Sequence, residues 1–120
     1  MPRMTRTILI VDDHSGFRRA ARALLTAEGF EVVGEAADGR VAIVEAERLR
    51  PGIVLLDIQL PDGDGFAVAE VLAARKQPPA VILISSRDGA SYGPQLTAAR
   101  VSGFLPKSRL TGAAIRALLA

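Results

Sequence analysis

Short apolar runs without polar interruptions constrain the fold of this chain more than any other feature. Three runs, residues 8–11, 53–56 and 81–84, contain only Ile, Val and Leu, and such short apolar runs favour strands. A strand with one face in water alternates apolar and polar side chains, so these runs predict strands that are covered on both faces. Strands of this kind are typical of the centre of a parallel sheet.

Two weaker strands complete the predicted sheet. One contains Val32 and Val33, in a segment where apolar and polar residues alternate, and the other is residues 103–105. Pro106 closes the latter strand and cannot donate a hydrogen bond to a neighbouring strand. We therefore place residues 103–105 at an edge of the sheet.

A helical pattern follows each of the five predicted strands. Gly29 is expected to stop the first helix, and Asp38 and Asp64 are expected to cap the second and the third. Residues 88–100 contain two glycines and a proline, and because each glycine costs about 1 kcal/mol inside a helix, we expect a short fourth helix that starts late. The fifth helix is expected over residues 111–120. The apolar positions of the strong helices are Phe17, Ala21, Leu24 and Leu25; Val41, Val44 and Leu49; Phe66, Val68, Val71 and Leu72; and Ile115, Leu118 and Leu119.

Strict alternation of strands and helices predicts an α/β fold, a doubly wound five-stranded parallel sheet with helices on both faces. The 120 residues are the length of one ordinary domain, so we predict a single domain over residues 1–120 with no output domain. Ligands of such folds bind at the carboxyl ends of the strands. A functional site is therefore expected at those ends.

Composition limits what this domain does. Hydrophobic residues make up 49% and charged residues 23% of the chain, as in globular proteins, and the absence of Cys excludes thiolate metal sites. No apolar run approaches the roughly 18 residues that span a bilayer, and no secretory leader pattern is present, so we expect a cytoplasmic protein without membrane contact. The net charge is +2, but scattered arginines and few aromatics argue against a direct nucleic-acid surface.

Polar side chains follow the predicted strands where the site is expected. They are Asp12 and Asp13 after the first strand, Asp57 after the third, Ser85 and Ser86 after the fourth, and Lys107 after the fifth. Two carboxylates about 4 Å apart repel by roughly 4 kcal/mol at a surface-like dielectric. A Mg²⁺ or Mn²⁺ ion removes this repulsion and binds phosphate oxygens, and Lys107 adds a charge that suits a phosphate. The pattern therefore predicts a site for phosphoryl transfer.

Asp57 is the predicted acceptor of the phosphoryl group. It ends the most apolar strand and precedes a loop rich in Pro and Gly, QLPDGDGF, that leaves its carboxylate accessible. An aspartate that attacks a phosphoryl group forms an aspartyl phosphate, a known form of covalent catalysis. Asp12 and Asp13 are then the expected metal ligands.

The fragments ILIVDDHSGFR, VLLDIQLPDGDGF, VILISS and GFLPKS occur in this order and together span the chain. They resemble the receiver domains of two-component response regulators, with closest similarity to receivers that precede helix-turn-helix output domains. The resemblance implies a flavodoxin-like sheet of strand order 2-1-3-4-5 and a sensor histidine kinase as phosphodonor. It also implies a switch in the surface formed by the fourth helix, fifth strand and fifth helix.

The resemblance further implies a role for each matched residue. Asp57 accepts the phosphoryl group; Asp12, Asp13, Asp57 and the backbone carbonyl of Gln59 bind the metal; Ser85 is the switch hydroxyl, Phe104 the switch aromatic, and Lys107 the phosphate-contacting lysine. Ser86 and Arg87 flank the phosphate pocket, where a long Arg87 side chain is expected to shield the acyl phosphate from water. Such a domain promotes only its own phosphorylation and dephosphorylation. Ser108 stands where many receivers have a proline after a cis peptide bond, which puts that geometry in question.

Two other functions fit the residues less well. Phosphatases with an aspartyl nucleophile need a second Asp two residues later, where this chain has Gln59. A flavodoxin would bind phosphate with amides after the first strand, where Asp12 and Asp13 repel it. The output stays open, because the chain is either a receiver that docks to another protein or the N-terminal part of a DNA-binding transcriptional regulator. A homodimer that forms on phosphorylation is a further expectation.

Four nearby residues are interpreted as structural. His14 follows the acidic pair but is expected to be an exposed loop residue rather than a metal ligand or general base. Ser15 is expected to cap the first helix. Asp62 and Asp64 are expected to serve in the turn and the cap of the third helix.

Overall fold

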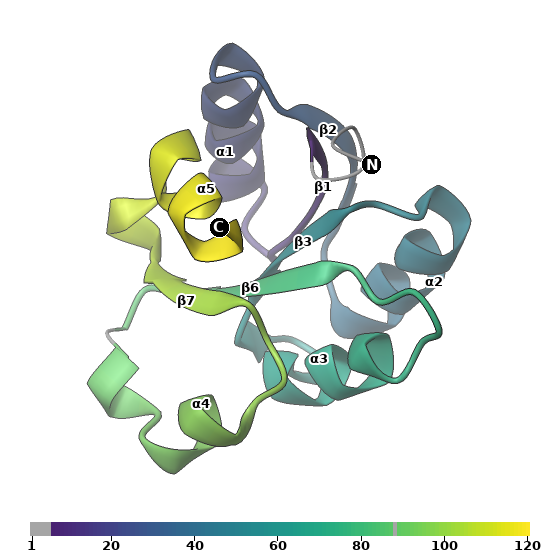
Figure 1. Cartoon of the computed structure of the whole chain (residues 1–120), viewed down its shortest axis with the longest axis vertical. Helices are drawn as coiled ribbons and strands as arrows, with labels where there is room; N and C mark the ends of the chain where they lie inside the picture. The colour runs from purple at the N-terminus through teal and green to yellow at the C-terminus, as the bar shows by residue number, and fades with distance from the viewer. Residues whose placement is uncertain (1–5, 88) are drawn as a thin grey trace.

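The computed structural model describes residues 6–87 and 89–120, which form alternating strands and helices (Figure 1). The elements are β1 (Thr7–Val11), α1 (Ser15–Ala27), β2 (Glu31–Ala36), α2 (Gly39–Leu49), β3 (Ile53–Asp57), β4 (Gln59–Leu60), β5 (Gly63–Asp64), α3 (Gly65–Ala73), β6 (Ala80–Ser85), the 3₁₀ turn η2 (Gly89–Ser91), α4 (Pro94–Ala98), β7 (Gly103–Pro106), the 3₁₀ turn η3 (Lys107–Arg109) and α5 (Gly112–Leu119). None of the helices in this described part combines the length and the apolar character needed to cross a membrane.

Five parallel strands form one sheet in the order β2-β1-β3-β6-β7. Because β6 and β7 are the fourth and fifth strands of this sheet along the chain, the order is the predicted 2-1-3-4-5. The three uninterrupted apolar runs lie in β1, β3 and β6, the central strands, and their side chains are buried on both faces. The strand that ends at Pro106 lies at an edge, as predicted.

Alternating side chains of the central strands divide the core into two layers, and helices lie on both faces of the sheet (Figure 1). One set, which includes Ile8, Leu55 and Ile84, packs with residues of α1 and α5. The other set, which includes Leu9 and Leu56, packs with residues of α2 and α3. Helices on both faces confirm the doubly wound fold that the sequence predicts.

The start of α1 differs from its prediction. The N-cap position belongs to His14 rather than to Ser15, and no side chain caps the helix there. The backbone N–H of His14 donates to Asp12 Oδ1 at 2.8 Å, which turns the chain so that the helix begins at Ser15. The predicted stop at Gly29 is confirmed, since Gly29 has φ +98° directly after the last turn.

Three of the apolar positions predicted for α2 and α3 lie on the exposed side of their helix. Val41 and Val44 of α2 are 41% and 59% exposed, and Val71 of α3 is 47% exposed. The positions of α2 that are 0% exposed are Ala42 and Ala46, and Ile43 and Leu49 are partly buried against the same core layer. The predicted apolar stripe is therefore wrong at these three valines, whereas Leu49 of α2 and Val68 and Leu72 of α3 pack in the core as predicted.

The remaining predictions on helix ends are confirmed, and one element was not predicted. Asp38 accepts the N–H of Val41 at 2.8 Å and Asp64 that of Ala67 at 2.9 Å. The fourth helix is short and starts only at Pro94. The loop after Asp57 forms a small antiparallel pair, β4 with β5, that the sequence did not indicate.

Candidate functional site

Two neighbouring central strands place Asp12 and Asp57 side by side at the carboxyl edge of the sheet. Val11 is the register partner of Leu56, so the residues that follow each of them lie next to one another. Asp12 is 0% and Asp57 is 3% exposed, so the expectation that the loop after Asp57 leaves its carboxylate accessible is wrong. Two ionised carboxylates in one buried site repel each other, so a positive charge beside them favours the ionised form of both.

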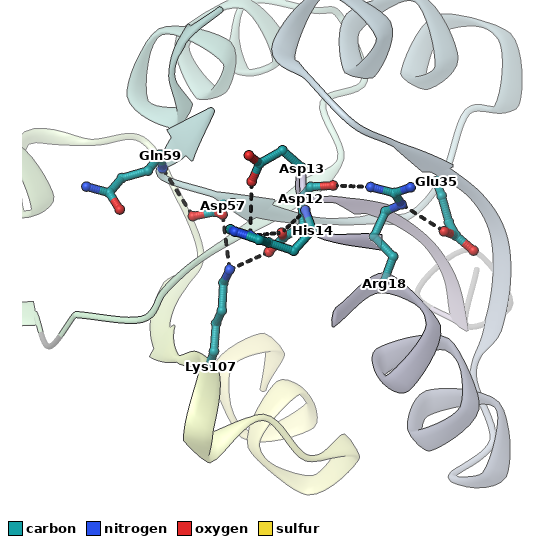
Figure 2. A network of polar contacts seen from close by, with 8 residues as sticks. All are labelled: Asp12, Asp13, His14, Arg18, Glu35, Asp57, Gln59 and Lys107. Atoms are coloured by element: carbon teal, nitrogen blue, oxygen red, sulfur yellow. Dashed lines mark hydrogen bonds and ion pairs between the residues drawn. The ribbon is translucent and has the colours of Figure 1, made fainter. Parts of the chain in front are cut away.

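Lys107 supplies that charge from the end of β7 (Figure 2). Its Nζ lies 2.6 Å from Asp12 Oδ2 and donates to Asp57 Oδ2 at 3.1 Å. Burial opposes the charged form of Lys107, but the two carboxylates outweigh burial, so the pKa of Lys107 is raised above its ordinary value. The strand end that carries Lys107 thus meets the strand ends that carry the acids, as the sequence predicts.

Asp57 is held in a fixed orientation by contacts from two sides. The backbone N–H of Gln59 donates to Asp57 Oδ1 at 3.1 Å while Lys107 contacts the other oxygen. Burial raises the pKa of Asp57, the Gln59 N–H and Lys107 lower it in part, and the charge of Asp12 adds to the rise. A carboxylate in this position gains from any further cation that binds beside it.

Asp13 and His14 border the same pocket on its exposed side. The Asp13 side chain is 37% exposed and His14 is 70% exposed, so the expectation of an exposed histidine is confirmed. Its ring nevertheless lies against the acids, with Nδ1 at 3.2 Å from Asp12 Oδ1 and 3.1 Å from Asp13 Oδ1. Asp12, Asp13, His14 and Asp57 each offer one ligand atom, and these atoms lie within 4.8 Å of one another.

Arg18 is a contact of the acidic loop that the sequence analysis missed. Its Nη1 donates to the backbone carbonyl of Asp12 at 2.6 Å, and its Nε pairs with Glu35 at 2.9 Å (Figure 2). Hydrogen bonds from Arg22 and Arg18 outweigh burial and hold the pKa of Glu35 below its ordinary value. Arg18 therefore ties the loop to β2. The only signal in the sequence is an arginine one helical turn after an acidic strand end, which is too common to be specific.

Ser85 lies one position beyond Ile84, the register partner of Asp57 on the neighbouring strand. It is fully buried, and its Oγ accepts the N–H of Arg87 at 3.0 Å and lies 2.5 Å from the hydroxyl of Tyr92. The side chains of Ser86 and Arg87 are exposed beside it. Tyr92 was not singled out in the sequence, although it is the only tyrosine.

Phe104 is partly buried in β7, and its ring centroid is 6.2 Å from that of Tyr92. The structure thus places the expected switch aromatic next to the partner of Ser85. Lys107 is followed by Ser108 through a trans peptide bond, because no cis bond occurs in the described residues.

The donor set of this pocket fits a hard divalent cation. Among the buried side-chain polar atoms of the described residues, Asp12 Oδ2 is the one without a hydrogen-bond partner. Lys107 lies close to it as an ion pair but not in hydrogen-bond geometry. Mg²⁺ prefers oxygen ligands and is typically bound by one or two carboxylates together with water. The edge therefore combines carboxylates that could hold a divalent cation, the Asp57 carboxylate held in a fixed orientation, and the ammonium group of Lys107.

This chain belongs to the class of doubly wound α/β proteins that carry acids and a lysine at the carboxyl edge of the sheet. A family-wide sequence profile described as the response regulator receiver domain matches residues 8–118. This chain belongs to the response regulator receiver domain family, whose members act in two-component systems as signalling switches and bind Mg²⁺ at an acidic pocket.

Curated relatives are longer proteins. A protein-glutamate methylesterase/protein-glutamine glutaminase of Alkalilimnicola ehrlichii is 44% identical over 103 residues, which is 82% of this chain and 26% of that protein. The DNA-binding transcriptional activator EvgA of Escherichia coli is 32% identical over 99 residues, 82% of this chain and 48% of that protein. The chain thus spans a quarter to a half of the length of these relatives.

Solved structures agree with the fold. The signal receiver domain of NarL from Mycobacterium tuberculosis is 33% identical with a TM-score of 0.82, and the match covers 96% of this chain and 94% of that one. The CheX-CheY-BeF3-Mg²⁺ complex of Borrelia burgdorferi is 26% identical with a TM-score of 0.80 over 94% of this chain and 85% of that one. The resemblance inferred from the sequence fragments is confirmed.

Proposed function

We propose that Asp57 accepts a phosphoryl group from the phosphohistidine of a sensor histidine kinase, with Mg²⁺ or Mn²⁺ bound by Asp12, Asp13, Asp57 and the backbone carbonyl of Gln59. The observation that carries the proposal is the buried Asp57 carboxylate, which lies beside a second buried acid and under the Lys107 ammonium. The structure of a related complex with beryllofluoride and magnesium supports the same chemistry.

In the proposed reaction, a carboxylate oxygen of Asp57 attacks phosphorus and the bond from phosphorus to the histidine nitrogen breaks. The products are the aspartyl phosphate and a free histidine of the kinase, so one bond forms and one breaks. A divalent cation held by Asp12, Asp13 and Asp57 would neutralise charge on the transferring group. Lys107 holds the carboxylate in place before the transfer and contacts the phosphate after it, and Ser85 then turns toward the new phosphate oxygens.

The proposed consequence is a change in the surface formed by α4, β7 and α5. Ser85 and Phe104 connect the pocket to this surface, because Ser85 ends β6 and Phe104 lies in the adjacent strand β7. The partner is a downstream protein or an output domain, since relatives of this chain include a methylesterase and a transcriptional activator. Phosphorylation-dependent pairing of two receivers belongs to the same proposal.

Labelling with a small phosphodonor tests the proposal. Incubation with acetyl phosphate and Mg²⁺ is expected to add one phosphoryl group to the wild-type chain, measured as intact mass, and Asp57→Asn is expected to add none. Asp62→Asn is the matched control, because Asp62 lies in the same loop but contacts the start of α2. Equal labelling of Asp57→Asn and wild type would refute the assignment.

A further inference from the structure

Tyr92 contacts the proposed switch hydroxyl, although it has no part in the proposed phosphoryl transfer. It lies in the turn between η2 and α4, and its hydroxyl is 2.5 Å from Oγ of the fully buried Ser85. The N–H of Arg87 donates to the same oxygen at 3.0 Å. Within residues 6–87 and 89–120, these are the two hydrogen-bond partners of the Ser85 hydroxyl.

The Tyr92 ring is packed where it can respond to a change at Ser85. Its centroid lies 5.9 Å from that of Phe66 at the start of α3 and 6.2 Å from that of Phe104 in β7. Tyr92 also lines an open pocket of about 340 Å³ that reaches Gln59 and Gln95. A tyrosine released from Ser85 therefore has space beside it and aromatic neighbours on two elements.

When the Ser85 hydroxyl donates to Tyr92, Tyr92 and a phosphoryl group on Asp57 compete for its single hydrogen. A serine hydroxyl has one donor hydrogen and two acceptor sites, and the Ser85 oxygen is held between Arg87 and Tyr92. A turn of this oxygen toward a phosphoryl group on Asp57 lengthens the contact with Tyr92. Phe104 has no hydroxyl that could replace that contact.

We propose that Tyr92 is a positioning residue that holds the Ser85 hydroxyl away from Asp57 until Asp57 is phosphorylated. The exchange of the contact between Ser85 and Tyr92 for one between Ser85 and phosphate releases the turn before α4. This inference rests on the proposed phosphorylation of Asp57. It adds that the hydroxyl of Tyr92, and not only the ring of Phe104, connects the pocket to α4.

The segment that contains Tyr92 has few stabilising contacts, so one hydrogen bond contributes a large part of its stability. The α4 helix has only five residues, and Gly93, at its N-cap, has φ +50°. No residue of η2 or α4 is buried. Loss of a hydrogen bond from such a segment shifts a population between two arrangements rather than unfolding the domain.

Tyr92 can be observed directly, because it is the only tyrosine and the chain has no tryptophan. We expect tyrosine fluorescence and near-ultraviolet absorption to change when Mg²⁺ and beryllofluoride are added together, and to change little with Mg²⁺ alone. Ser85→Ala is expected to shift the ligand-free spectrum toward that of the bound state and to remove most of the response. An unchanged tyrosine spectrum, while fluorine NMR shows beryllofluoride bound to the protein, would overturn the role of Tyr92.

Tyr92→Phe is the conservative variant, because it keeps the ring and removes only the hydroxyl. It is expected to bind beryllofluoride about two- to tenfold more tightly, the range for one net hydrogen bond, and to have no such effect in the Ser85→Ala background. Equal affinity of Tyr92→Phe and wild type would contradict the inference. Binding by wild type but not by Asp57→Asn supports the proposed function separately, whereas failure of wild type to bind would overturn both.

Discussion

Lys107 balances two buried carboxylates with a single charge, so it competes with any cation that binds the same acids. Its Nζ lies 2.6 Å from Asp12 and 3.1 Å from Asp57. In Lys107→Met we expect about tenfold tighter Mg²⁺ binding by calorimetry, because a nearby like charge is removed. Labelling by acetyl phosphate is expected to become slower, because the phosphate loses its ammonium contact.

Arg109→Met provides the control for that experiment. Arg109 lies two residues away in the same 3₁₀ turn and has an exposed side chain, so its loss should leave Mg²⁺ affinity and labelling near wild type. Weaker Mg²⁺ binding by Lys107→Met would show that the ammonium supports the cation site instead of competing with it.

Ionisation of Asp62 is expected to make the stability of the fold depend on pH in the acid range. Its carboxylate accepts the N–H groups of Gly39 and Arg40 at 2.9 and 3.0 Å, and these bonds lower the pKa of Asp62 below its ordinary value. A lowered folded-state pKa means that the stabilisation is present above the unfolded pKa, about 3.9, and is lost as pH falls through the folded value. Asp62→Asn is therefore expected to melt at a lower temperature than wild type at pH 7.

The difference in melting temperature between wild type and Asp62→Asn is expected to shrink as pH falls below about 4. At that pH the Asp62 side chain of the wild type becomes neutral as well. Melting curves followed by circular dichroism at pH 7, 5 and 3 measure this. A difference that stays constant with pH would show that the charge of Asp62 contributes nothing.

Residues that act through one specific contact could not be predicted from the sequence. Asp12, Asp57 and Lys107 were predictable because each follows a strand, and parallel strands end at one edge. Tyr92 and Arg18 lie in a turn and a helix, where the direction of a side chain depends on packing that no periodic pattern encodes. Asp62 was interpreted as a turn residue, and its contact with α2 depends on how two loops meet in space.

Gly65 fixes where α3 begins relative to the strand that carries Asp57. A Cβ at Gly65 would lie 2.4 Å from the carbonyl oxygen of Asp57 and 2.9 Å from Cα of Ile58. Because backbone atoms cannot move aside cheaply, Gly65→Ala is expected to lower the free energy of unfolding by about 1–3 kcal/mol or more. It should also slow the labelling of Asp57.

Gly16→Ala is the matched control for Gly65→Ala, since a Cβ at Gly16 meets no atom within 4 Å. Gly16 lies in the first turn of α1, where alanine is expected to be neutral or to add about 0.5–1 kcal/mol. Urea unfolding of both variants gives the comparison. Similar stability of the two would show that α3 can shift without cost.

Helix orientation was predicted well where the buried residues are large and poorly where they are small. The stripe of α1 contains the buried Leu25, and Ile115 of α5 is fully buried as expected. In α2 the side chains of Ala42 and Ala46 are 0% exposed, while Val44 is 59% exposed. Hydrophobicity alone favours valine over alanine for the core, so no signal in the sequence indicated the buried alanines.

A few sequence features determine the arrangement of the sheet, and that arrangement determines where the site lies. Three runs without polar residues identify the central strands, alternation with helices makes them parallel, and the carboxyl edge then collects the acids. The order of the strands came from the resemblance to receivers rather than from the runs themselves. The distances that decide the chemistry, such as those around Lys107, required the structure.

The clustering of acids at this edge is expected to make the stability of the entire domain depend on Mg²⁺. At Mg²⁺ concentrations above the dissociation constant, each tenfold increase in concentration raises the free energy of unfolding by about 1.4 kcal/mol. This corresponds to roughly 5 °C in melting temperature for a domain of this size. Asp13→Asn is expected to lose most of this increase, because it removes the exposed ligand without touching the pair of Asp12 and Lys107. Asp38→Asn, which alters only the cap of α2, should keep the full response. Equal increases in wild type and Asp13→Asn would place the cation elsewhere on the molecule.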